Sequence, residues 1–318
     1  MNLIQTSITS AFSYLIKIVL LFVTNKIIAV YLGPPGIALI GQLQNFINIS
    51  LTFANGGIGS GLTKYLSEFR DNEEKTKKFI STSTFITLFC SVFVAFFIII
   101  FNKFLAVNLL KDEDFSYLFI IFSFSLIIFA INNLLLNILN GMKEIKKLIT
   151  INTYANLISF LFSLFLITTY KLHGALISLV TSQSAVFIIT LFFVLKSKWF
   201  KLKNFIPNYN NETASKLFGF SLMTFTSIFF INFSQIIIRN FIVYNQSVES
   251  AGYWQSIVKL SDIYLGFITM TLSIYYLPRL SEIKDKSILK KEIFSGYKII
   301  LPALFIMNIS IYFLRFFI

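Results

Sequence analysis

Residues 66–101 read LSEFRDNEEKTKKFISTSTFITLFCSVFVAFFIIIF. The first part of this stretch is a short and highly charged loop, and the run from Phe79 to Phe101 then contains no charged residue. An α-helix needs roughly 20 apolar residues to cross the hydrocarbon core of a bilayer, so this run is long enough to span a membrane. Similar apolar runs follow one another along the chain, with short loops between them. The pattern predicts an all-α polytopic membrane protein.

The composition favours lipid rather than water as the solvent of this chain. Hydrophobic residues make up 56% of it, charged residues 13%, and 39 of the 318 residues are Phe. A water-soluble domain averages about 25% charged residues and could not bury this much apolar surface. The chain has one cysteine, Cys90, and one histidine, His173, which excludes an internal disulfide and does not supply a structural zinc site. We expect neither a metal nor a cofactor.

Lysine and arginine residues gather in alternate loops. Cytoplasmic loops of membrane proteins collect these residues, so the pattern predicts a cytoplasmic N-terminus. It also accounts for the net charge of +13 without a nucleic-acid partner. The crowded loops hold Lys64, Arg70, Lys75, Lys77 and Lys78; Lys143, Lys146 and Lys147; Lys196, Lys198, Lys201, Lys203 and Lys216; and Arg279, Lys284, Lys286, Lys290, Lys291 and Lys298. The loops between them hold Lys103, Lys111, Lys171, Arg239 and Arg315.

The apolar runs predict nine spans and a C-terminal stub. They are expected to be helices, because only helices and closed barrels satisfy the backbone in lipid, and a barrel would show period-two alternation. The longest linker divides the chain into a six-helix lobe (1–195), a basic cytoplasmic linker (196–213) and a partial second lobe (214–318). The predicted spans are Gln5–Tyr31, Gly36–Leu62, Phe79–Phe101, Phe115–Leu139, Leu148–Thr169, Ala175–Leu195, Ala214–Tyr244, Ala251–Leu277 and Ile293–Leu314.

An internal repeat relates the first two spans to the seventh and eighth. Residues 66–71 (LSEFRD) match residues 280–285 (LSEIKD), and Lys26 matches Arg239 at nearly the same offset. Internal repeats are typical of transporters whose substrate site lies between the halves. The copies are offset by six spans, an even number, so both halves enter the membrane in the same direction. A second half equal to the first needs six spans, and we therefore expect the chain to be C-terminally truncated.

Charged residues inside the predicted spans are candidate site residues, because charge in hydrocarbon is costly and usually faces a cavity. Lys17 and Lys26 lie in the first span, Arg239 in the seventh, and Lys259 and Asp262 in the eighth. This mostly cationic set would recruit an anion. For Lys26 and Arg239 the alternative is snorkelling to the membrane interface, and for Lys259 and Asp262 it is a structural ion pair. Asp262, the one deep carboxylate, is the candidate for proton or sodium coupling.

Polar stripes at helical spacing run along most spans. Gln235 belongs with Asn232 and Arg239 to a stripe of the seventh span, and Asn48 belongs to a stripe of the second. One such stripe favours helix packing, whereas stripes on most spans favour a hydrated cavity. The others include Gln44 and Asn55 in the second span; Asn133, Asn137 and Asn140 in the fourth; and Asn152, Asn156, Ser159 and Ser163 in the fifth.

Three shorter motifs have plainer readings. Gly33-Pro34-Pro35-Gly36 predicts a tight turn between the first two spans. The glycine-rich run 55–61 is expected to thin or bend the second span, and it lacks the Lys-Ser/Thr of a phosphate-binding loop. The acidic run 112–114 fits a solvated charge cluster better than the metal motif of a glycosyltransferase.

The chain resembles the O-antigen translocase family, and within it the enterobacterial common antigen flippases. This family belongs to the multidrug/oligosaccharidyl-lipid/polysaccharide exporter superfamily. The resemblance covers the whole chain. It is carried by residues 32–36 (LGPPG), 61–65 (GLTKY), 252–255 (GYWQ), 261–265 (SDIYL) and 276–278 (YLP).

The resemblance implies a MATE-like fold of two six-helix lobes around a V-shaped cavity. It implies alternating-access transport of an undecaprenyl-pyrophosphate-linked oligosaccharide from the inner to the outer leaflet of the bacterial inner membrane. It also implies that Lys17, Lys26 and Arg239 meet the pyrophosphate, and Lys259, Gln235 and Asn48 complete the set expected to bind substrate. Polysaccharide polymerase or chain-length proteins are candidate partners.

Three alternatives stay open at this point. A multidrug-type exporter of small molecules would need acidic cavity residues for cationic drugs. A polytopic glycosyltransferase or polymerase would need a sizeable outer loop with catalytic groups, and the predicted outer loops are short. An inactive truncated fragment is the third alternative.

Overall fold

The computed structural model describes residues 3–271, together with isolated residues and pairs between 290 and 313. The second copy of the repeat, at 280–285, and the end of the eighth predicted span lie outside the described residues, as does most of the predicted span Ile293–Leu314. The chain divides into two compact units, Met1–Gln255 and Ser256–Ile318. The first unit holds most of the described residues. The predicted lobe boundaries at 195 and 213 stay predictions.

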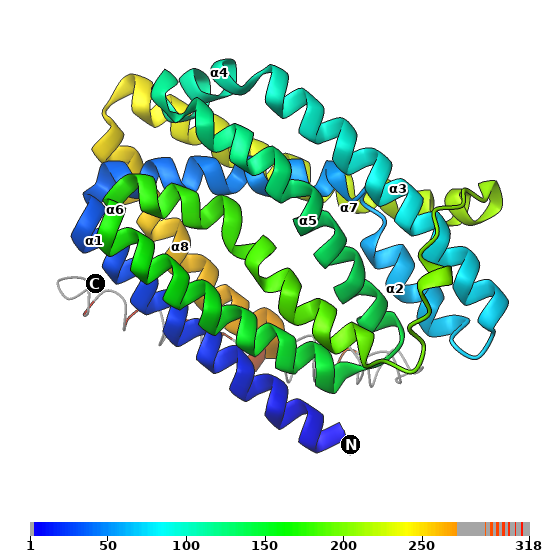
Figure 1. Cartoon of the computed structure of the whole chain (residues 1–318). Coiled ribbons are helices and arrows are strands. Elements are labelled where there is room, and N and C mark those ends of the chain that lie inside the picture. Colours follow the sequence, from blue (N-terminus) through cyan, green and yellow to red (C-terminus); the bar gives the residue numbers. More distant parts are fainter. Residues whose placement is uncertain are drawn as a thin grey trace. The chain divides into compact units, whose positions relative to one another are not determined.

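The described residues are almost entirely helical, which confirms the all-α prediction (Figure 1). Five helices are long and apolar enough to cross a membrane. They are joined by short turns that include a π-helical turn at Ala106–Leu110 and 3₁₀ turns at Glu113–Phe115 and Leu202–Asn204. The α-helices are α1 (Leu3–Ala54), α2 (Gly59–Glu68), α3 (Glu73–Ile100), α4 (Asn102–Leu105), α5 (Ser116–Gly141), α6 (Ile145–Leu195), α7 (Asn211–Asn245) and α8 (Val248–Thr271).

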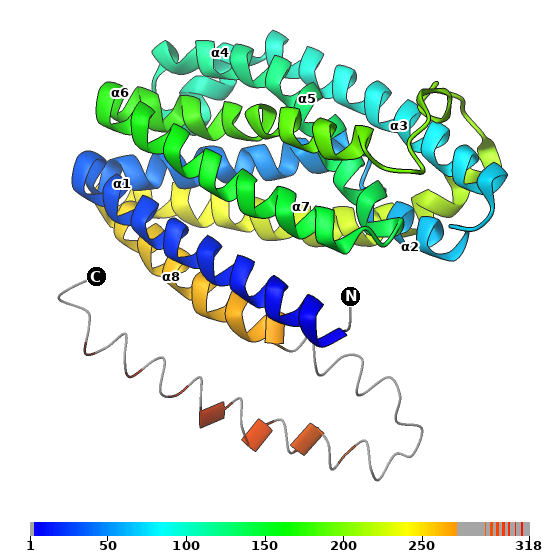
Figure 2. The same ribbon diagram turned by 60° about the horizontal axis from the view of Figure 1, so that its bottom comes forward.

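Two of the long helices, α1 and α6, fold back on themselves at a single residue. Gly33 in α1 has φ 62° and ψ −173°, and Lys171 in α6 has φ 48° and ψ −122°. Figures 1 and 2 show the chain reversing direction at both elbows, so that each helix consists of two arms. Both elbows fall between spans that the sequence predicts as separate. Pro34 and Pro35 suit the start of the second arm, where their missing N–H groups leave no helical hydrogen bond unmade.

The second predicted span ends earlier than expected. The sequence places its end at Leu62, whereas α1 ends at Ala54 and α2 starts at Gly59. Gly56 and Gly57 adopt φ of +60° and +63°, which only glycine adopts readily. These two residues separate α1 from α2. The predicted bend at the glycine-rich run is therefore a complete break.

Two asparagine caps start helices after basic loops. The Asn72 side chain accepts a hydrogen bond from the backbone N–H of Lys75, with Glu73 and Glu74 in the first turn of α3. The Asn210 side chain likewise accepts from the backbone N–H of Thr213 at the start of α7. Both caps satisfy N–H groups that helix formation leaves unpaired, and the two glutamates suit the positive end of the helix dipole.

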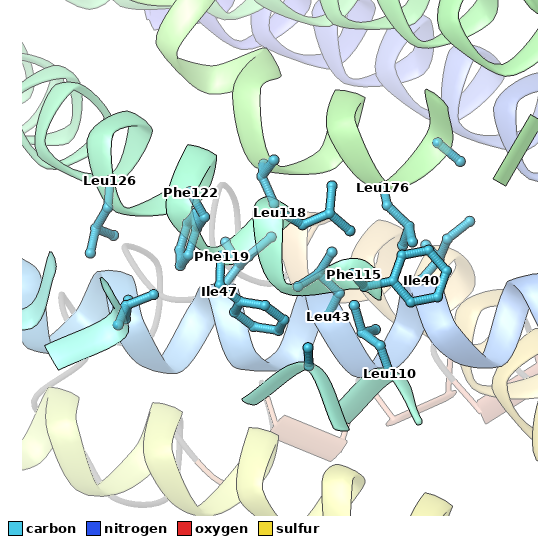
Figure 3. Packing of buried hydrophobic residues seen from close by; sticks show 14 of the residues in the cluster. Ile40, Leu43, Ile47, Leu110, Phe115, Leu118, Phe119, Phe122, Leu126 and Leu176 are labelled. Carbon is cyan, nitrogen blue, oxygen red and sulfur yellow. The ribbon is translucent and has the colours of Figure 1, made fainter. Parts of the chain in front are cut away.

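The largest apolar cluster lies between the second arm of α1, α5 and the second arm of α6 (Figure 3). Leu43 and Ile47 of α1 pack there with Phe119 and Phe122 of α5 and Leu176 of α6, and all five are 2% exposed or less. On α3, by contrast, Phe89, Phe93 and Phe96 are more than half exposed. Exposed phenylalanines on a long apolar helix are what contact with lipid requires.

The first unit has two ends of different character. The elbows of α1 and α6, the α4 region and the α7–α8 junction lie together at one end (Figures 1 and 2), which we call the elbow end. The opposite end carries α2, the turn 142–144 and the linker 196–210. We call it the basic end because the crowded lysine loops within residues 64–78, 143–147 and 196–216 are there. Lys201 pairs with Glu73 there, and Lys147 donates to Ser197 at 2.7 Å.

Candidate functional site

A polar cavity of about 420 Å³ lies between α1, α2, α5 and α7. Five asparagines contribute to its wall, and threonine, serine and glycine supply most of the rest. The lining residues are Asn48, Leu51, Thr52, Asn55, Gly57, Gly59, Ser60, Asn133, Asn137, Thr224, Ile228 and Asn232. We call this space the asparagine cavity.

The cavity forms where three of the predicted polar stripes converge. Asn48 and Asn55 come from α1, Asn133 and Asn137 are one turn apart on α5, and Asn232 comes from α7. The stripe of the fifth predicted span does not contribute to the lining, nor does Asn140. The sequence thus predicts the polar faces, and the packing of α1, α5 and α7 brings three of them together.

Amide groups in the wall bond to one another. Asn48 Nδ2 donates to Asn232 Oδ1 at 3.0 Å, and Gln44 Nε2 donates to Asn48 Oδ1 at 3.1 Å. Across the cavity, Asn137 Nδ2 donates to Asn133 Oδ1 at 3.2 Å. A side-chain amide has two N–H donors and two lone pairs, so each asparagine keeps bonding capacity for a ligand. A wall of this kind suits ligands rich in hydroxyl and amide groups.

None of the residues that line the asparagine cavity carries a formal charge. Of the residues that the sequence predicts to bind substrate, only Asn48 is in the lining. The predicted cations lie elsewhere, so the described cavity is polar and neutral rather than cationic.

Arg239 lies further along α7 and is 2% exposed. Its two terminal nitrogens donate to Gln42 Oε1 of α1 and Gln255 Oε1 of α8, and its guanidinium carbon lies 5.6 Å from the centre of the Trp254 ring. Gln42 also donates to Asn240 Oδ1 at 3.2 Å. The side chain is enclosed by other helices, which is the opposite of snorkelling.

Gln235 lies one helical turn before Arg239, between it and Asn232, and is half-buried. Its Oε1 atom is buried and has no hydrogen-bond partner among the described residues. Asn232 and Arg239 of this α7 stripe bond to Asn48 and Gln42 on the second arm of α1. The spacing predicts the shared polar face but not the helix that it meets.

Lys17 and Lys26 lie on the first arm of α1, and both are exposed. The Lys17 ammonium lies 5.9 Å from the Tyr14 ring, and the neighbouring Ser13 hydroxyl bonds to Thr153 of α6 at 2.6 Å. Neither lysine lines the asparagine cavity. Their predicted role in binding stays a prediction.

Lys259 and Asp262 belong to the second unit, which begins at Ser256. Lys259 is half-buried there and Asp262 is exposed. Their predicted roles in substrate binding and ion coupling also stay predictions.

Within the described residues, no group of three or more His, Cys, Asp or Glu side chains is placed to hold a metal ion. The acidic run 112–114 has local structural roles. Glu113 pairs with Lys103 at 2.9 Å, and the Asp112 carboxylate accepts from the backbone N–H of Asp114 at 2.9 Å.

The sequence does not predict that Arg239 bonds to Gln42 and Gln255, nor that Gly41 makes room for Gln255. Gln255 lies in the eighth predicted span, one helical turn before Lys259, but a shared helical face does not identify a partner. Gly41 leaves room for Gln255, because a Cβ at position 41 would stand 2.5 Å from Gln255 Cδ. In the sequence, the feature that hints at this contact is Gly41 next to Gln42 in the second predicted span.

The comparisons with known proteins agree with this fold. The family model for polysaccharide biosynthesis proteins matches residues 3–284. The lipid III flippase of Escherichia coli K12 is 27% identical over 319 aligned positions, which cover 99% of this chain and 76% of that protein. A Shigella flexneri protein provisionally named an O-antigen transporter is 24% identical over 96% of this chain and 74% of its own length.

Among solved structures, the fold is similar to an inward-facing multidrug resistance MATE family transporter of the MOP superfamily. The TM-score is 0.65 at 12% sequence identity, over 97% of this chain and 72% of that one. The helices long enough to cross a membrane, the fold and the relatives agree on a multi-pass protein of the bacterial inner membrane, and on a transporter rather than an enzyme. The chain belongs to the polysaccharide biosynthesis protein family.

Proposed function

We propose that this protein is a flippase that moves a lipid-linked oligosaccharide across the inner membrane. The observation that carries the proposal is the neutral asparagine cavity between α1, α5 and α7. Its amides supply the donors and acceptors that sugar hydroxyl and acetamido groups need. The relatives named as a lipid III flippase and an O-antigen transporter support the same substrate class.

The substrate that fits best is an undecaprenyl-pyrophosphate-linked repeat unit, carried from the inner to the outer leaflet. The lysine-rich loops at the basic end support a cytoplasmic basic end and N-terminus, because cytoplasmic loops collect lysine and arginine. Transport then proceeds by alternating access, with a six-helix lobe rocking against a second lobe that begins after the linker 196–213. The sugar enters the cavity while the polyprenyl chain stays in the bilayer.

The anionic pyrophosphate needs cationic partners outside the neutral cavity. Lys17, Lys26, Arg239 and Lys259 are the candidates, with Gln235 and Asn48 beside the sugar. Asp262 is the candidate for coupling transport to a proton or sodium gradient. Separate regions for the sugar and the diphosphate suit a ligand whose head carries both a neutral and a charged part.

The alternative is export of small cationic molecules, which the fold of the multidrug transporter allows. A cation-exporting cavity needs a carboxylate, and the asparagine cavity has none in its lining. The neutral wall therefore favours the oligosaccharide.

Purified protein in proteoliposomes distinguishes the two functions. We expect it to move a fluorescent polyprenyl-diphosphate oligosaccharide between leaflets, measured by loss of accessibility to an added lectin or quencher. A cationic dye loaded into the same vesicles should not be released faster than from empty vesicles. Dye release without movement of the oligosaccharide would overturn the proposal in favour of the exporter.

A further inference from the structure

The second arm of α1 and α7 run antiparallel and meet along a line of polar side chains. Gln42 bonds to Asn240 at 3.2 Å near one end of this line, and Asn48 bonds to Asn232 at 3.0 Å further along. Beyond the helix break, Ser60 of α2 bonds to Thr224 at 3.1 Å. We call this line the α1–α7 seam. Asn48 and Asn232 also line the asparagine cavity, so the seam and the cavity are continuous.

Toward the elbow end the seam finishes in a clasp of Arg239, Gln42 and Gln255. The guanidinium joins three helices, because it donates to Gln42 of α1 and to Gln255 of α8 while belonging to α7. Gly41 makes the clasp possible, since any side chain at that position would occupy the place of the Gln255 amide. The clasp is about two helical turns from Asn48, or roughly 10 Å along α1.

The charge in the clasp has no acidic partner among the described residues. Both hydrogen bonds of Arg239 go to neutral amide oxygens, and its Nε has no partner there. A buried guanidinium without a carboxylate is costly, and hydrogen bonds to an anionic oxygen are roughly twice as strong as those to a neutral one. A phosphate oxygen that reached Arg239 would therefore displace the two glutamines.

The rest of the seam consists of polar groups that could form hydrogen bonds with water if the two helices separated. Asn45 Nδ2 and Gln235 Oε1 are buried without a described partner, and the antiparallel register places these two residues at the same level. Burying a polar group without a hydrogen-bond partner costs free energy, and hydrogen bonds to water would remove that cost. The amide pairs on either side exchange with water at small net cost.

We propose that Arg239, Gln42 and Gln255 form a gate, which closes the seam at the elbow end and which a phosphate group of the substrate opens by binding the guanidinium. The inference rests on the proposed function for the identity of the anion. It assigns Arg239 two states, one bonded to glutamines and one bonded to phosphate. Binding of the diphosphate to Arg239 then breaks its hydrogen bonds to the two glutamines and opens the seam at the elbow end.

Thiol labelling tests the gate directly. The chain has one cysteine, so Cys90→Ala gives a cysteine-free background, and Asn45→Cys then places a thiol inside the seam. In lipid nanodiscs we expect slow reaction of this thiol with a membrane-impermeant maleimide. Loss of the charged hydrogen bonds in Arg239→Gln should speed the reaction by at least about tenfold.

Gly41→Ala is the second variant, because its added methyl group displaces the Gln255 amide without replacing any of the three clasp residues. Gly219→Ala is its matched control, since a Cβ at position 219 meets nothing within 4 Å. We expect faster labelling in Gly41→Ala and an unchanged rate in Gly219→Ala. Equal rates in Gly41→Ala, Arg239→Gln and the starting protein would overturn the gate, including where Arg239→Gln folds poorly and only Gly41→Ala can be measured.

Opening by phosphate is tested with geranylgeranyl diphosphate and, as control, geranylgeraniol. The diphosphate should accelerate labelling of the Arg239 protein, the alcohol should not, and Arg239→Gln should respond to neither. Acceleration by both compounds, or by neither, would overturn the role of the anion. Labelling that follows the predicted pattern in a protein that moves no lipid-linked oligosaccharide would leave the gate standing and reject the flippase.

Discussion

At the scale of single residues, glycines set how closely the helices of the first unit approach. Gly252, near the start of α8, lies so close to the α1 elbow that a Cβ there would stand 2.0 Å from the Pro34 carbonyl oxygen. That oxygen belongs to the backbone and cannot rotate away. The same elbow contains Gly33, which supplies the positive φ of the turn.

Gly252→Ala should therefore destabilise the protein. The added methyl must push α8 and the elbow apart, and overpacking of this kind costs about 1–3 kcal/mol. The melting temperature in detergent, followed by loss of monodisperse protein on heating, should fall. Gly219→Ala is the matched control and should melt at or slightly above the starting protein, because alanine is the better helix former. An equal melting temperature for Gly252→Ala and Gly219→Ala would contradict the close approach.

The residues of the site were predictable as faces but not as contacts. The spacing of Asn133 and Asn137, or of Asn232 and Arg239, gives the side of a helix that is polar. It does not say that Asn48 bonds to Asn232, or that Gln42 meets Arg239, because those contacts depend on how α1 and α7 pack. The cationic cavity that the sequence predicts was inferred from charge alone, and burial of Arg239 beneath Gln42 and Gln255 needs the packing to be seen.

At the scale of elements, the positions of the α1 and α6 elbows were the most predictable feature. Gly33, Pro34 and Pro35 punctuate α1 strongly, and the run around Lys171 interrupts the apolar pattern of α6. The break between α1 and α2 was less predictable. Apolar periodicity continues through it, and only the paired positive φ angles of Gly56 and Gly57 end the helix there.

The linker between α6 and α7 is fastened to the basic end by a few polar contacts. Lys201 pairs with Glu73 of α3, and Thr82 donates to the Asn208 carbonyl oxygen at 3.2 Å. Trp199 packs near Phe205, at 6.5 Å between ring centres. The Lys201–Glu73 pair is exposed, so its contribution to stability is expected to be small and to weaken with salt.

Lys201→Ala should loosen the linker slightly without unfolding the helices. Amide hydrogen exchange of residues 202–208 should rise only slightly in the variant, since an exposed ion pair contributes little to stability. High salt should produce the same rise in the starting protein and little further change in Lys201→Ala. Lys198→Ala, an exposed lysine in the same linker, serves as control. Equal exchange in the Lys198 and Lys201 variants would show that the ion pair does not fasten the linker.

At the scale of the whole chain, opposite chemical characters are kept apart. Among the described residues, the lysine-rich loops lie at the basic end, and the asparagine cavity carries no charge in its lining. Arg239 is buried near the other end of α7. A ligand with a neutral glycan and a diphosphate would meet the asparagines and the arginine at different places. Its diphosphate would then bind Arg239 in the clasp while its sugar occupies the cavity.

The most direct test of the central claim is the rate of leaflet exchange of a polyprenyl-diphosphate oligosaccharide in proteoliposomes, measured for paired asparagine variants. Asn48→Leu and Asn137→Leu each remove amide groups from the cavity wall and keep the number and branching of the side-chain heavy atoms. Asn245→Leu, on an exposed position near the end of α7, is the control. We predict at least about tenfold slower exchange in each cavity variant, because a buried polar ligand group left without a partner costs about 1–3 kcal/mol, and an unchanged rate in Asn245→Leu. Full exchange rates in both cavity variants, in protein that inserts and folds normally, would contradict the assignment of the asparagine cavity as the place where the sugar binds.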